Sequence, residues 1–315
     1  MTRIKAALVT HLLIGQDPLA SSVGMAATGK RYPHSNLLAV VAGAALRTQA
    51  HVHRRPVDLY VEAGSMLGGS VVTAARASSS LGVEMTILAL DPFTGDTNMW
   101  DGEARLVHTQ PDAFHFLEFQ NGEPQIYPRF LSNIRRAGLA NCVLPLRLTA
   151  TVGLRLLASL VKRRVLPQKP PVIYLDSAHN PGETLQELGV AWQTLPVNGM
   201  LYGDDWGWRA VRTDVARFAE CIGPASNGSK SSKRNCAVCK LHHRRGAEEG
   251  ARGHKKKDQW PLHRDLLSGP SRAALSCHLQ PMVPTLALVV ALRPDGRLYC
   301  IVASGLFLRV RATQI

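Results

Sequence analysis

The sequence lacks any uncharged apolar run that approaches the roughly 18 residues of a membrane-spanning helix. It also has few cysteines for a chain of 315 residues. The six are Cys142, Cys221, Cys236, Cys239, Cys277 and Cys300. Cysteines this sparse do not form a disulfide framework, which favours a reducing compartment. With 45% hydrophobic residues, the chain is long enough for one full α/β domain plus appendages, so we expect an intracellular, cytoplasmic globular protein.

Acidic residues are nearly absent from the start of the chain and scarce at its end. Residues 1–56 hold 7 Lys and Arg against 1 acid, residues 57–220 hold 14 against 17, and residues 221–315 hold 16 against 5. The net charge of +14 therefore belongs to the flanks, while the part that looks folded is near neutral. This distribution disfavours a nucleic-acid partner, although the basic flanks leave one open.

Two segments in residues 1–56 have helical spacing of apolar residues: IKAALVTHLLI and SNLLAVVAGAALR. They predict an N-terminal helical cap over the core. The alternative is an organelle transit peptide, since the segment is acid-poor and bears Ser and Ala. A secretory signal is disfavoured because no small-residue cleavage site closes the first apolar run.

Residues 57–62 (VDLYVE) predict a buried strand, followed by a glycine-rich turn (AGSMLGGS) and a helix (VVTAARASSSLG). Glycines let the backbone approach a nucleotide-like ligand, and a helix N-terminus offers free N–H groups. The spacing is not G-x-G-x-x-G, which disfavours a nicotinamide cofactor. The alternative is structural, because any α/β domain needs a glycine-rich first turn.

A second predicted strand, residues 84–90, ends in Asp91. An acid at this position typically accepts hydrogen bonds from both ribose hydroxyls of a nucleotide-like ligand. The residues that follow, PFTGDTNMWDGEA, suit an active-site loop. Within this loop we interpret Asp96 and Asp101 as solvated side chains.

Residues 172–208 (VIYLDSAHNPGETLQELGVAWQTLPVNGMLYGDDWGW) have a strand, loop, helix, strand pattern. The first strand ends in Asp176 and the second in Asp204 and Asp205. Because the carboxyl ends of parallel strands meet at one edge of a sheet, we expect these carboxylates and His179 to face one crevice. Carboxylates suit Mg²⁺ or another hard cation, and a nearby His suits proton abstraction.

Each of these residues also has a structural alternative. Asp204 or Asp205 can cap the helix that follows. His179 can be a surface loop residue. Trp206 and Trp208 can wall a substrate pocket or pack beneath the following helix, and the sequence does not separate the two.

Taken together, the motifs resemble those of class I S-adenosylmethionine-dependent methyltransferases. The matching residues are VEAGSMLGGS at 61–70, Asp91, LDSAH at 175–179 and GMLYGDDW at 199–206. Within that superfamily the chain is most similar to the metal-dependent, macrocin-type sugar O-methyltransferases, over about residues 30–220. The resemblance implies an α/β, Rossmann-like doubly wound fold. Its mostly parallel, seven-stranded sheet would carry helices on both faces and end in a C-terminal antiparallel hairpin.

The resemblance also implies a role for each matching residue. Glu62, Gly64 and Ser65 would line the S-adenosylmethionine site, Ser70 would contact the methionyl end, and Asp91 would bind the ribose. Asp176, Asp204 and Asp205 would hold Mg²⁺ or another divalent cation, and His179 would be the catalytic base. One departure is the Asp-Asp pair, where relatives have Glu-Asp or Asp-Asn.

The remaining chain divides by composition. Residues 57–221 are the predicted methyltransferase core, residues 222–282 a basic and largely disordered insertion, and residues 283–315 a closing strand hairpin around a Pro-Asp-Gly turn. Cys236 and Cys239 are followed by His242 and His243, but a histidine so close behind the second cysteine is poor zinc geometry.

The sequence therefore predicts a metal-assisted O-methyltransferase (a transferase of the EC 2.1.1 type) that acts on a hydroxyl of a small molecule such as a sugar or glycoside. Two rivals stay open: a catalytically degenerate binding module of the same fold, and a basic nucleic-acid-interacting protein whose flanks do the work. The acceptor and the oligomeric state are not fixed by the sequence, because specificity lies in loop shapes.

Overall fold

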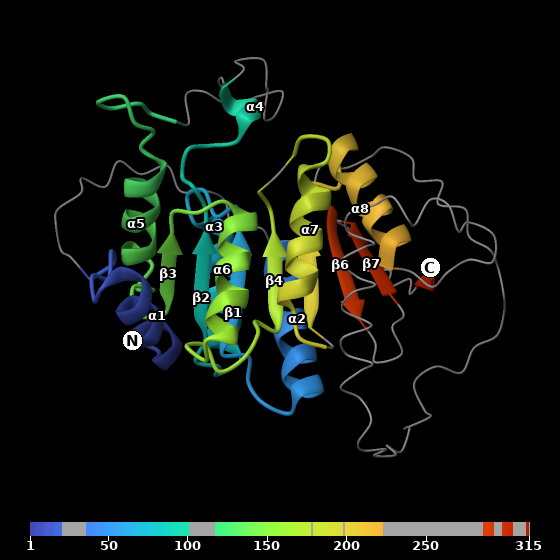
Figure 1. Ribbon diagram of the computed structural model, residues 1–315, viewed down its shortest axis with the longest axis horizontal. Helices are drawn as coiled ribbons and strands as arrows, with labels where there is room; N and C mark the ends of the chain where they lie inside the picture. Colours follow the sequence, from blue (N-terminus) through green and yellow to red (C-terminus); the bar gives the residue numbers. More distant parts are fainter. Residues whose placement is uncertain are drawn as a thin grey trace.

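The computed structural model describes residues 1–20, 36–100, 117–177, 179–197, 199–222, 286–292, 298–304 and 313–314. Five parallel strands form its centre, in the order β3-β2-β1-β4-β5 (Figure 1). They are β1 (Leu59–Ala63), β2 (Thr86–Leu90), β3 (Val143–Leu146), β4 (Val172–Leu175) and β5 (Met200–Gly203). The order reverses between β1 and β4, which is the switch point of a doubly wound sheet. The predicted α/β, Rossmann-like arrangement is confirmed.

Beyond β5 the sheet continues with β6 (Leu286–Leu292), β7 (Leu298–Ser304) and β8 (Thr313–Gln314), each antiparallel to its neighbour. The predicted closing hairpin falls on β6 and β7, whose side chains lie outside the described residues. With the two-residue β8 the described strands of this sheet number eight, and the predicted seven-stranded sheet closed by a hairpin stays a prediction, as does the division into domains. Residues 223–285, with the candidate zinc cysteines, also lie outside the described residues.

Helices cover both faces of the sheet (Figure 1). One apolar cluster joins the sheet to α2 (Asn36–His53), α3 (Gly69–Ser80) and α5 (Ile126–Arg136). A second cluster on the other face joins it to α1 (Arg3–Leu13), α6 (Ala150–Lys162), α7 (Glu183–Thr194) and α8 (Arg209–Ile222). The short α4 (Thr97–Trp100) stands above the carboxyl edge. Among the described helices, none combines the length and hydrophobicity that a membrane crossing requires.

The two helices expected in residues 1–56 are present as α1 and α2, and they pack on opposite faces of the sheet. In α1, Leu8 and Lys5 are fully buried. The Lys5 ammonium donates to the carbonyl of Ala140 and pairs with Asp17 at 2.7 Å, which satisfies its charge in the interior. Helix α1 is therefore part of the core.

The carboxyl edge of the sheet is held in register by backbone hydrogen bonds that continue one residue past the strands. The N–H of Asp91 donates to a β3 carbonyl at 3.2 Å, that of Asp176 to a β1 carbonyl at 2.8 Å, and that of Asp204 to a β4 carbonyl at 3.2 Å. Three acids predicted to belong to the site thus start from fixed backbone positions at one edge.

Candidate functional site

At Gly64 the backbone of the turn after β1 contacts the backbone of the loop after β4. The φ of this glycine is +84°, and a Cβ built there would lie 1.9 Å from the carbonyl oxygen of Asp176 and 2.7 Å from the Cα of Ser177. Only glycine fits such an approach between two backbones. The two predicted half-sites, one for a cofactor and one for a metal, are therefore in direct contact at the switch point.

Buried polar atoms without a partner line the first half-site. Glu62 is fully buried near the end of β1, and its Oε1 accepts a hydrogen bond from the Ser70 hydroxyl at 2.6 Å. Neither Glu62 Oε2 nor the Oγ of the buried Ser65 has a hydrogen-bond partner among the described residues. Burial raises the pKa of Glu62 to about 8. The hydroxyls of Ser70 and Ser65 oppose this rise, although the Ser65 contact falls short of hydrogen-bond geometry. Orphaned buried polar atoms of this kind fit the polar end of a ligand.

Asp91 connects the β1 turn to the loop after β2. Its Oδ2 accepts the N–H of Met66 at 2.7 Å, and its Oδ1 accepts the N–H of Phe93 at 2.5 Å. Burial raises the pKa of this carboxyl, and the backbone hydrogen bonds oppose the rise. Each carboxylate oxygen can accept more than one hydrogen bond, so Asp91 retains capacity for two ribose hydroxyls.

The loops at this edge hold three side-chain-bearing residues in the left-handed region of backbone space. Met66, Phe93 and Asp205 have φ values of 42°, 58° and 59°. Such a conformation costs about 1–2 kcal/mol per residue and persists only where the surroundings enforce it. Backbone strain of this kind often occurs at functional sites, but five of the eight described non-glycine residues with positive φ lie elsewhere, so it does not by itself single out this edge.

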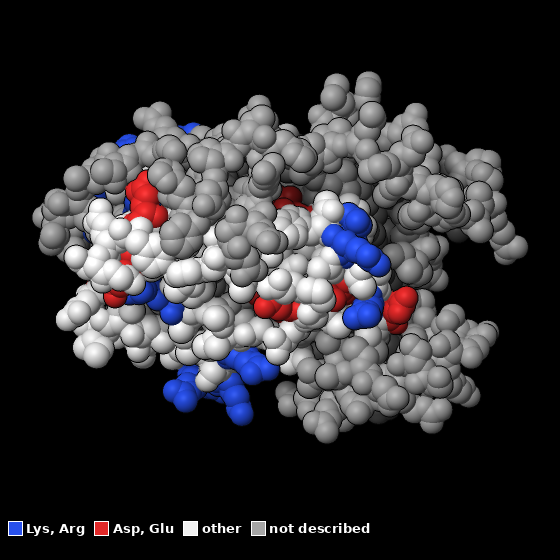
Figure 2. Space-filling model, turned by 90° about the horizontal axis from the view of Figure 1, so that it is seen from above, with Lys and Arg blue, Asp and Glu red and all other residues white. Residues whose placement is uncertain are grey.

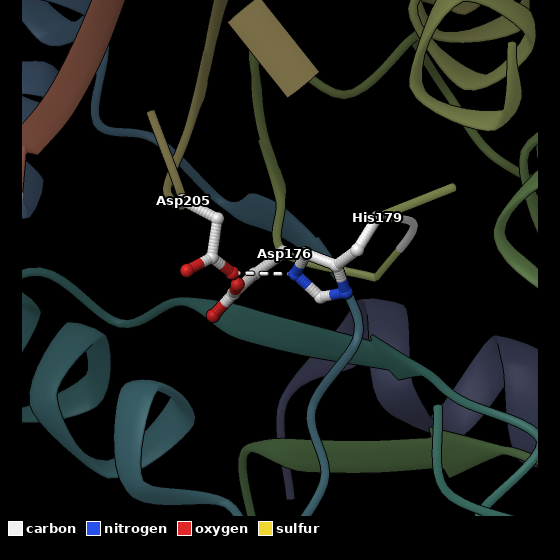
Figure 3. A group of neighbouring side chains, drawn as sticks. All are labelled: Asp176, His179 and Asp205. Carbon is white, nitrogen blue, oxygen red and sulfur yellow. Dashed lines mark hydrogen bonds and ion pairs between the residues drawn. The ribbon is translucent and has the colours of Figure 1, made fainter. Parts of the chain in front are cut away.

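The second half-site brings Asp176, His179 and Asp205 together (Figure 3). One ligand atom from each lies within 4.8 Å of the others, and His179 Nε2 is 2.5 Å from Asp205 Oδ2. Burial, followed by the charges of Asp205 and Asp204, raises the pKa of Asp176 well above its ordinary value. A divalent cation would relieve this concentration of negative charge. The donor set, two carboxylates and an imidazole, fits such an ion.

Asp204 lies beside this group but is not part of it. Its Oδ2 accepts the hydroxyl of the buried Tyr174 at 3.3 Å, and the same hydroxyl lies 3.1 Å from Asp176 Oδ2. Its Oδ1 accepts the N–H of Asp205 at 2.8 Å. Of the three predicted metal ligands, the structure therefore brings two together with His179, while Asp204 faces the tyrosine.

His179 contacts a carboxylate with each ring nitrogen. Besides the Asp205 contact, its Nδ1 lies 2.7 Å from Asp96 Oδ2. Burial alone would lower the pKa of His179, but the hydrogen bonds with Asp205 and Asp96 outweigh it and raise the pKa to about 10. With this pKa the imidazole is protonated on both ring nitrogens near neutral pH, and each nitrogen faces a carboxylate.

Sequence reasoning missed Asp96, and its interpretation as a solvated loop residue is wrong. The side chain is only 14% exposed and is engaged with His179. The signal that was available is its place in a loop that leaves the same sheet edge as Asp176. Asp101 lies outside the described residues.

The two tryptophans after the acidic pair have different environments. The Trp208 ring lies 5.0 Å from the His179 ring, centroid to centroid, and the residue is 36% exposed. Trp206 packs against the apolar cluster on the α7 and α8 face. Trp206 thus packs against the fold, while Trp208 lies beside His179 and its place in the wall of a substrate pocket stays a prediction.

The face above the carboxyl edge carries no single dense basic patch over its described residues. Figure 2 shows Lys and Arg (blue) in separate groups there, with acidic side chains (red) and other residues (white) among them. The basic residues that motivated a nucleic-acid partner lie mostly in the flanks, and residues 223–285 are outside the described part. That alternative stays a prediction.

No protein-family model and no curated protein matches this sequence. Among solved structures, an O-methyltransferase from Bacillus cereus in complex with SAH is 16% identical, with a TM-score of 0.36, and the match covers 78% of this chain and 85% of that one. An O-methyltransferase from Streptomyces achromogenes in complex with SAM is 15% identical, with a TM-score of 0.36 and coverages of 71% and 78%. A precorrin 8w decarboxylase from Methanobacterium thermoautotrophicum is 12% identical, with a TM-score of 0.39 and coverages of 61% and 74%. Likeness this loose does not bear on function, which must be argued from the site.

Proposed function

We propose that this chain is an S-adenosylmethionine-dependent O-methyltransferase that uses a divalent cation to methylate a hydroxyl of a small molecule, such as a sugar or glycoside. One observation carries the proposal. At the switch point of the sheet, the close backbone approach at Gly64 brings the β1 turn, with its unpartnered buried polar atoms, against a cluster of two carboxylates and an imidazole. A methyl donor and a metal-held acceptor need this adjacency, because the reacting atoms must meet in line. The mostly parallel seven-stranded sheet with its closing hairpin belongs to the same proposal.

The first half-site would hold the cofactor. Glu62, Gly64 and Ser65 would line its methionyl part together with Ser70, and Asp91 would accept hydrogen bonds from the ribose. The unpartnered Oε2 of Glu62 supports this assignment. A cationic ammonium group beside it would lower the raised pKa of this carboxyl and give the buried atom a partner.

The second half-site would hold the acceptor through Mg²⁺ or another divalent cation. Asp176 and Asp205 supply the oxygen ligands, and Asp204 becomes the third only if its side chain leaves Tyr174. The bound cation lowers the pKa of a hydroxyl near it. His179 is the proposed base: with Asp205 on the cation, its Nε2 would release to solvent the proton that now faces Asp205, and it could then accept the proton of the acceptor hydroxyl. Trp208 flanks the imidazole and restricts its movement.

The test is a methyl-transfer screen over sugars, catechols and glycosides, read by mass spectrometry with Mg²⁺ or with excess chelator. We expect a methylated product with Mg²⁺ and its loss in chelator. Asp205→Asn should lower the rate by about 10²-fold or more, because it removes a metal ligand and a contact of His179. Asp58→Asn is the matched control, since Asp58 bonds Gln168 at the opposite end of β1. Transfer that proceeds unchanged in chelator would remove the metal from the proposal.

A binding module of the same fold is the second candidate. It is favoured by the engagement of both His179 nitrogens with carboxylates, which leaves no free basic atom in the described arrangement. Such a module would bind S-adenosylmethionine but transfer no methyl group to any acceptor at any metal concentration. The same screen, combined with a cofactor-binding measurement, separates the two.

A further inference from the structure

Asp96 and His179 come from different loops but form a close contact. Asp96 lies in the loop between β2 and α4, His179 in the loop between β4 and α7, and Asp96 Oδ2 is 2.7 Å from His179 Nδ1. Both side chains are mostly buried, at 14% and 15% exposure. A hydrogen bond between positions 83 residues apart in the chain is therefore shielded from water, which strengthens it.

Asp96 is itself oriented by its neighbours. Its Oδ1 accepts two hydrogen bonds from Asn98, one from the backbone N–H at 2.7 Å and one from Nδ2 at 2.6 Å. This leaves Oδ2 directed at the imidazole. A second link between the same two loops runs from Asn180 Nδ2 to Thr97 Oγ1 at 3.3 Å. The hydrogen bonds from Asn98 thus hold one oxygen of the carboxylate, while the other oxygen contacts His179.

We propose that Asp96 is the positioning residue of His179. By accepting a hydrogen bond from Nδ1–H, it orients the ring so that Nε2 faces Asp205, Asp176 and the acceptor hydroxyl, and it keeps a proton on Nδ1 when Nε2 has lost its own. The inference rests on the proposed function for its catalytic meaning, although the contact itself does not.

The physical basis of this role is that imidazole has two ring nitrogens, and a hydrogen bond to one of them affects the other. A carboxylate bonded to Nδ1–H keeps that proton in place, orients the ring, and stabilises the cation that forms when Nε2 takes up a proton. The ring is also flanked by Trp208, so it is held from two directions. The negative charge of Glu187 on α7 acts on His179 as well, but no hydrogen bond joins those two side chains in the described structure. Among the described residues, Asp96 is therefore the hydrogen-bond partner of His179 Nδ1.

The same loop begins at Asp91, the proposed ribose partner. Only five positions separate the acid that would contact the cofactor from the acid that orients the base. Placement of the base is in this way tied to the wall of the cofactor site. A change at Asp96 should nevertheless leave the cofactor contacts intact, because Asp91 bonds Met66 and Phe93 independently of it.

The first arm of the test compares Asp96→Asn with Asp58→Asn, which alters a hydrogen-bonded carboxyl far from the site. In Asp96→Asn we expect kcat to fall about 10²-fold, while KM and the dissociation constant of S-adenosylhomocysteine change less than about twofold. Asn98→Ala, which removes one support of Asp96, should give a smaller loss in the same direction. Asp58→Asn should keep the kcat of the unaltered protein.

The second arm does not depend on catalysis. A hydrogen-bonded, buried Nδ1–H gives a downfield proton NMR signal protected from solvent exchange. It is assigned to His179 by its loss in His179→Gln, and it is distinguished from an Nε2–H signal by its persistence in Asp205→Asn. We expect this signal in the unaltered protein and in Asp58→Asn, and its loss or upfield shift in Asp96→Asn. If no methyl transfer is found with any acceptor, the proposed function fails while this signal still tests the link between Asp96 and His179.

Three results would overturn the proposal. The first is a kcat for Asp96→Asn equal to that of the unaltered protein. The second is an unshifted Nδ1–H signal that persists in Asp96→Asn. The third is a loss of kcat matched by equal losses of thermal stability and cofactor affinity, which would make Asp96 a structural residue only.

Discussion

Buried acids set the chemistry of the site at the scale of single residues. Burial raises the pKa of Glu62 to about 8 and that of Glu187 to about 7, and it raises the pKa of Asp176 well above its ordinary value. Each carboxyl would be more stable as an anion if a cation lay beside it. A cationic cofactor and a metal ion would favour the anionic form of the buried carboxyl groups beside them. Binding of either should therefore raise the free energy of unfolding.

Glu62 predicts how stability depends on pH. Its pKa is raised from about 4.5 to about 8 in the folded protein, so the folded state binds more protons than the unfolded state between these values. Its contribution is fully present below pH 4.5 and is lost as pH rises through 8. Glu62→Gln should therefore flatten the fall in unfolding free energy across this window, by an amount on the order of a few kcal/mol.

Urea denaturation at several pH values between 5 and 9 measures this difference, and comparison with Glu62→Gln separates Glu62 from Glu187. A parallel decline in the two proteins would show that Glu62 is ionised without cost. Saturating S-adenosylhomocysteine should restore part of the stability of the unaltered protein at the high end.

Gly64 predicts a steric effect shared by both half-sites. Gly64→Ala places a Cβ 1.9 Å from the Asp176 carbonyl oxygen at a φ of +84°, so the two loops must separate. We expect a loss of about 2–4 kcal/mol in unfolding free energy and weaker binding of cofactor and metal alike. The matched control is Gly82→Ala, where φ is +65° but nothing lies within 4 Å of the new Cβ, so only about 1 kcal/mol of backbone strain remains. Equal effects of the two changes, by thermal unfolding, would contradict this account.

The sequence could predict which residues lie at the carboxyl ends of the strands. Asp91 and Asp176 each follow a buried run of apolar residues, so their position at the sheet edge followed from the pattern. The choice between Asp204 and Asp205 did not, because it depends on the left-handed backbone of Asp205. Asp96 was missed because a contact 83 residues away leaves no local signature.

At the scale of elements, the loop that carries His179 is held by a neighbouring helix. Gly182 precedes α7 and has no side chain with which to cap it, and Asp214 on α8 takes this role. Its Oδ2 accepts the N–H groups of Gly182 at 2.7 Å and Leu185 at 3.2 Å. A buried carboxylate at a helix N-terminus satisfies free donors and opposes the positive end of the helix dipole.

Asp214→Ala should cost about 1–2 kcal/mol in unfolding free energy and loosen the β4–α7 loop. Hydrogen–deuterium exchange should show faster exchange at residues 179–185 than in the unaltered protein, with little change in β1 and β2. Asp214→Asn is the control, because its carbonyl oxygen can still accept one of the hydrogen bonds. Unchanged exchange in Asp214→Ala would show that the loop does not depend on this cap.

The order and type of the elements could be predicted, and their bounds only approximately. The strand expected at 84–90 begins at Thr86, and the one expected at 57–62 spans Leu59–Ala63. Continuous apolar runs identify buried parallel strands, but the ends depend on which residues pair with a neighbouring strand. The short α4 was not predicted, since a single turn inside a glycine-bearing loop has no periodicity.

At the scale of the whole molecule, the first helix belongs to the core. Leu8 is fully buried in the cluster that joins α1 to the sheet and to α6. Leu8→Ala should lower the unfolding free energy by about 2–5 kcal/mol. Thr10→Ala, on the exposed side of the same helix, should change it by less than about 0.5 kcal/mol. Similar melting temperatures for the two variants would mean that α1 is dispensable.

The five parallel strands have the doubly wound arrangement that was predicted, and the structure places the switch point between β1 and β4. That arrangement was implied by the resemblance to the methyltransferases, whereas the strand and helix pattern alone indicated only an α/β fold. The long basic segment had no comparable pattern. Its basic, polar composition predicted only a largely disordered insertion without a role, and residues 223–285 lie outside the described part of the chain.

Calorimetric titration with S-adenosylmethionine tests the central claim most directly. The account predicts saturable one-to-one binding by the unaltered protein, kept in Asp58→Asn. It predicts binding at least tenfold weaker in Asp91→Ala, a loss of about 1.4 kcal/mol or more. An absence of binding heat and of any thermal stabilisation by S-adenosylmethionine, in protein shown to be folded, would contradict it.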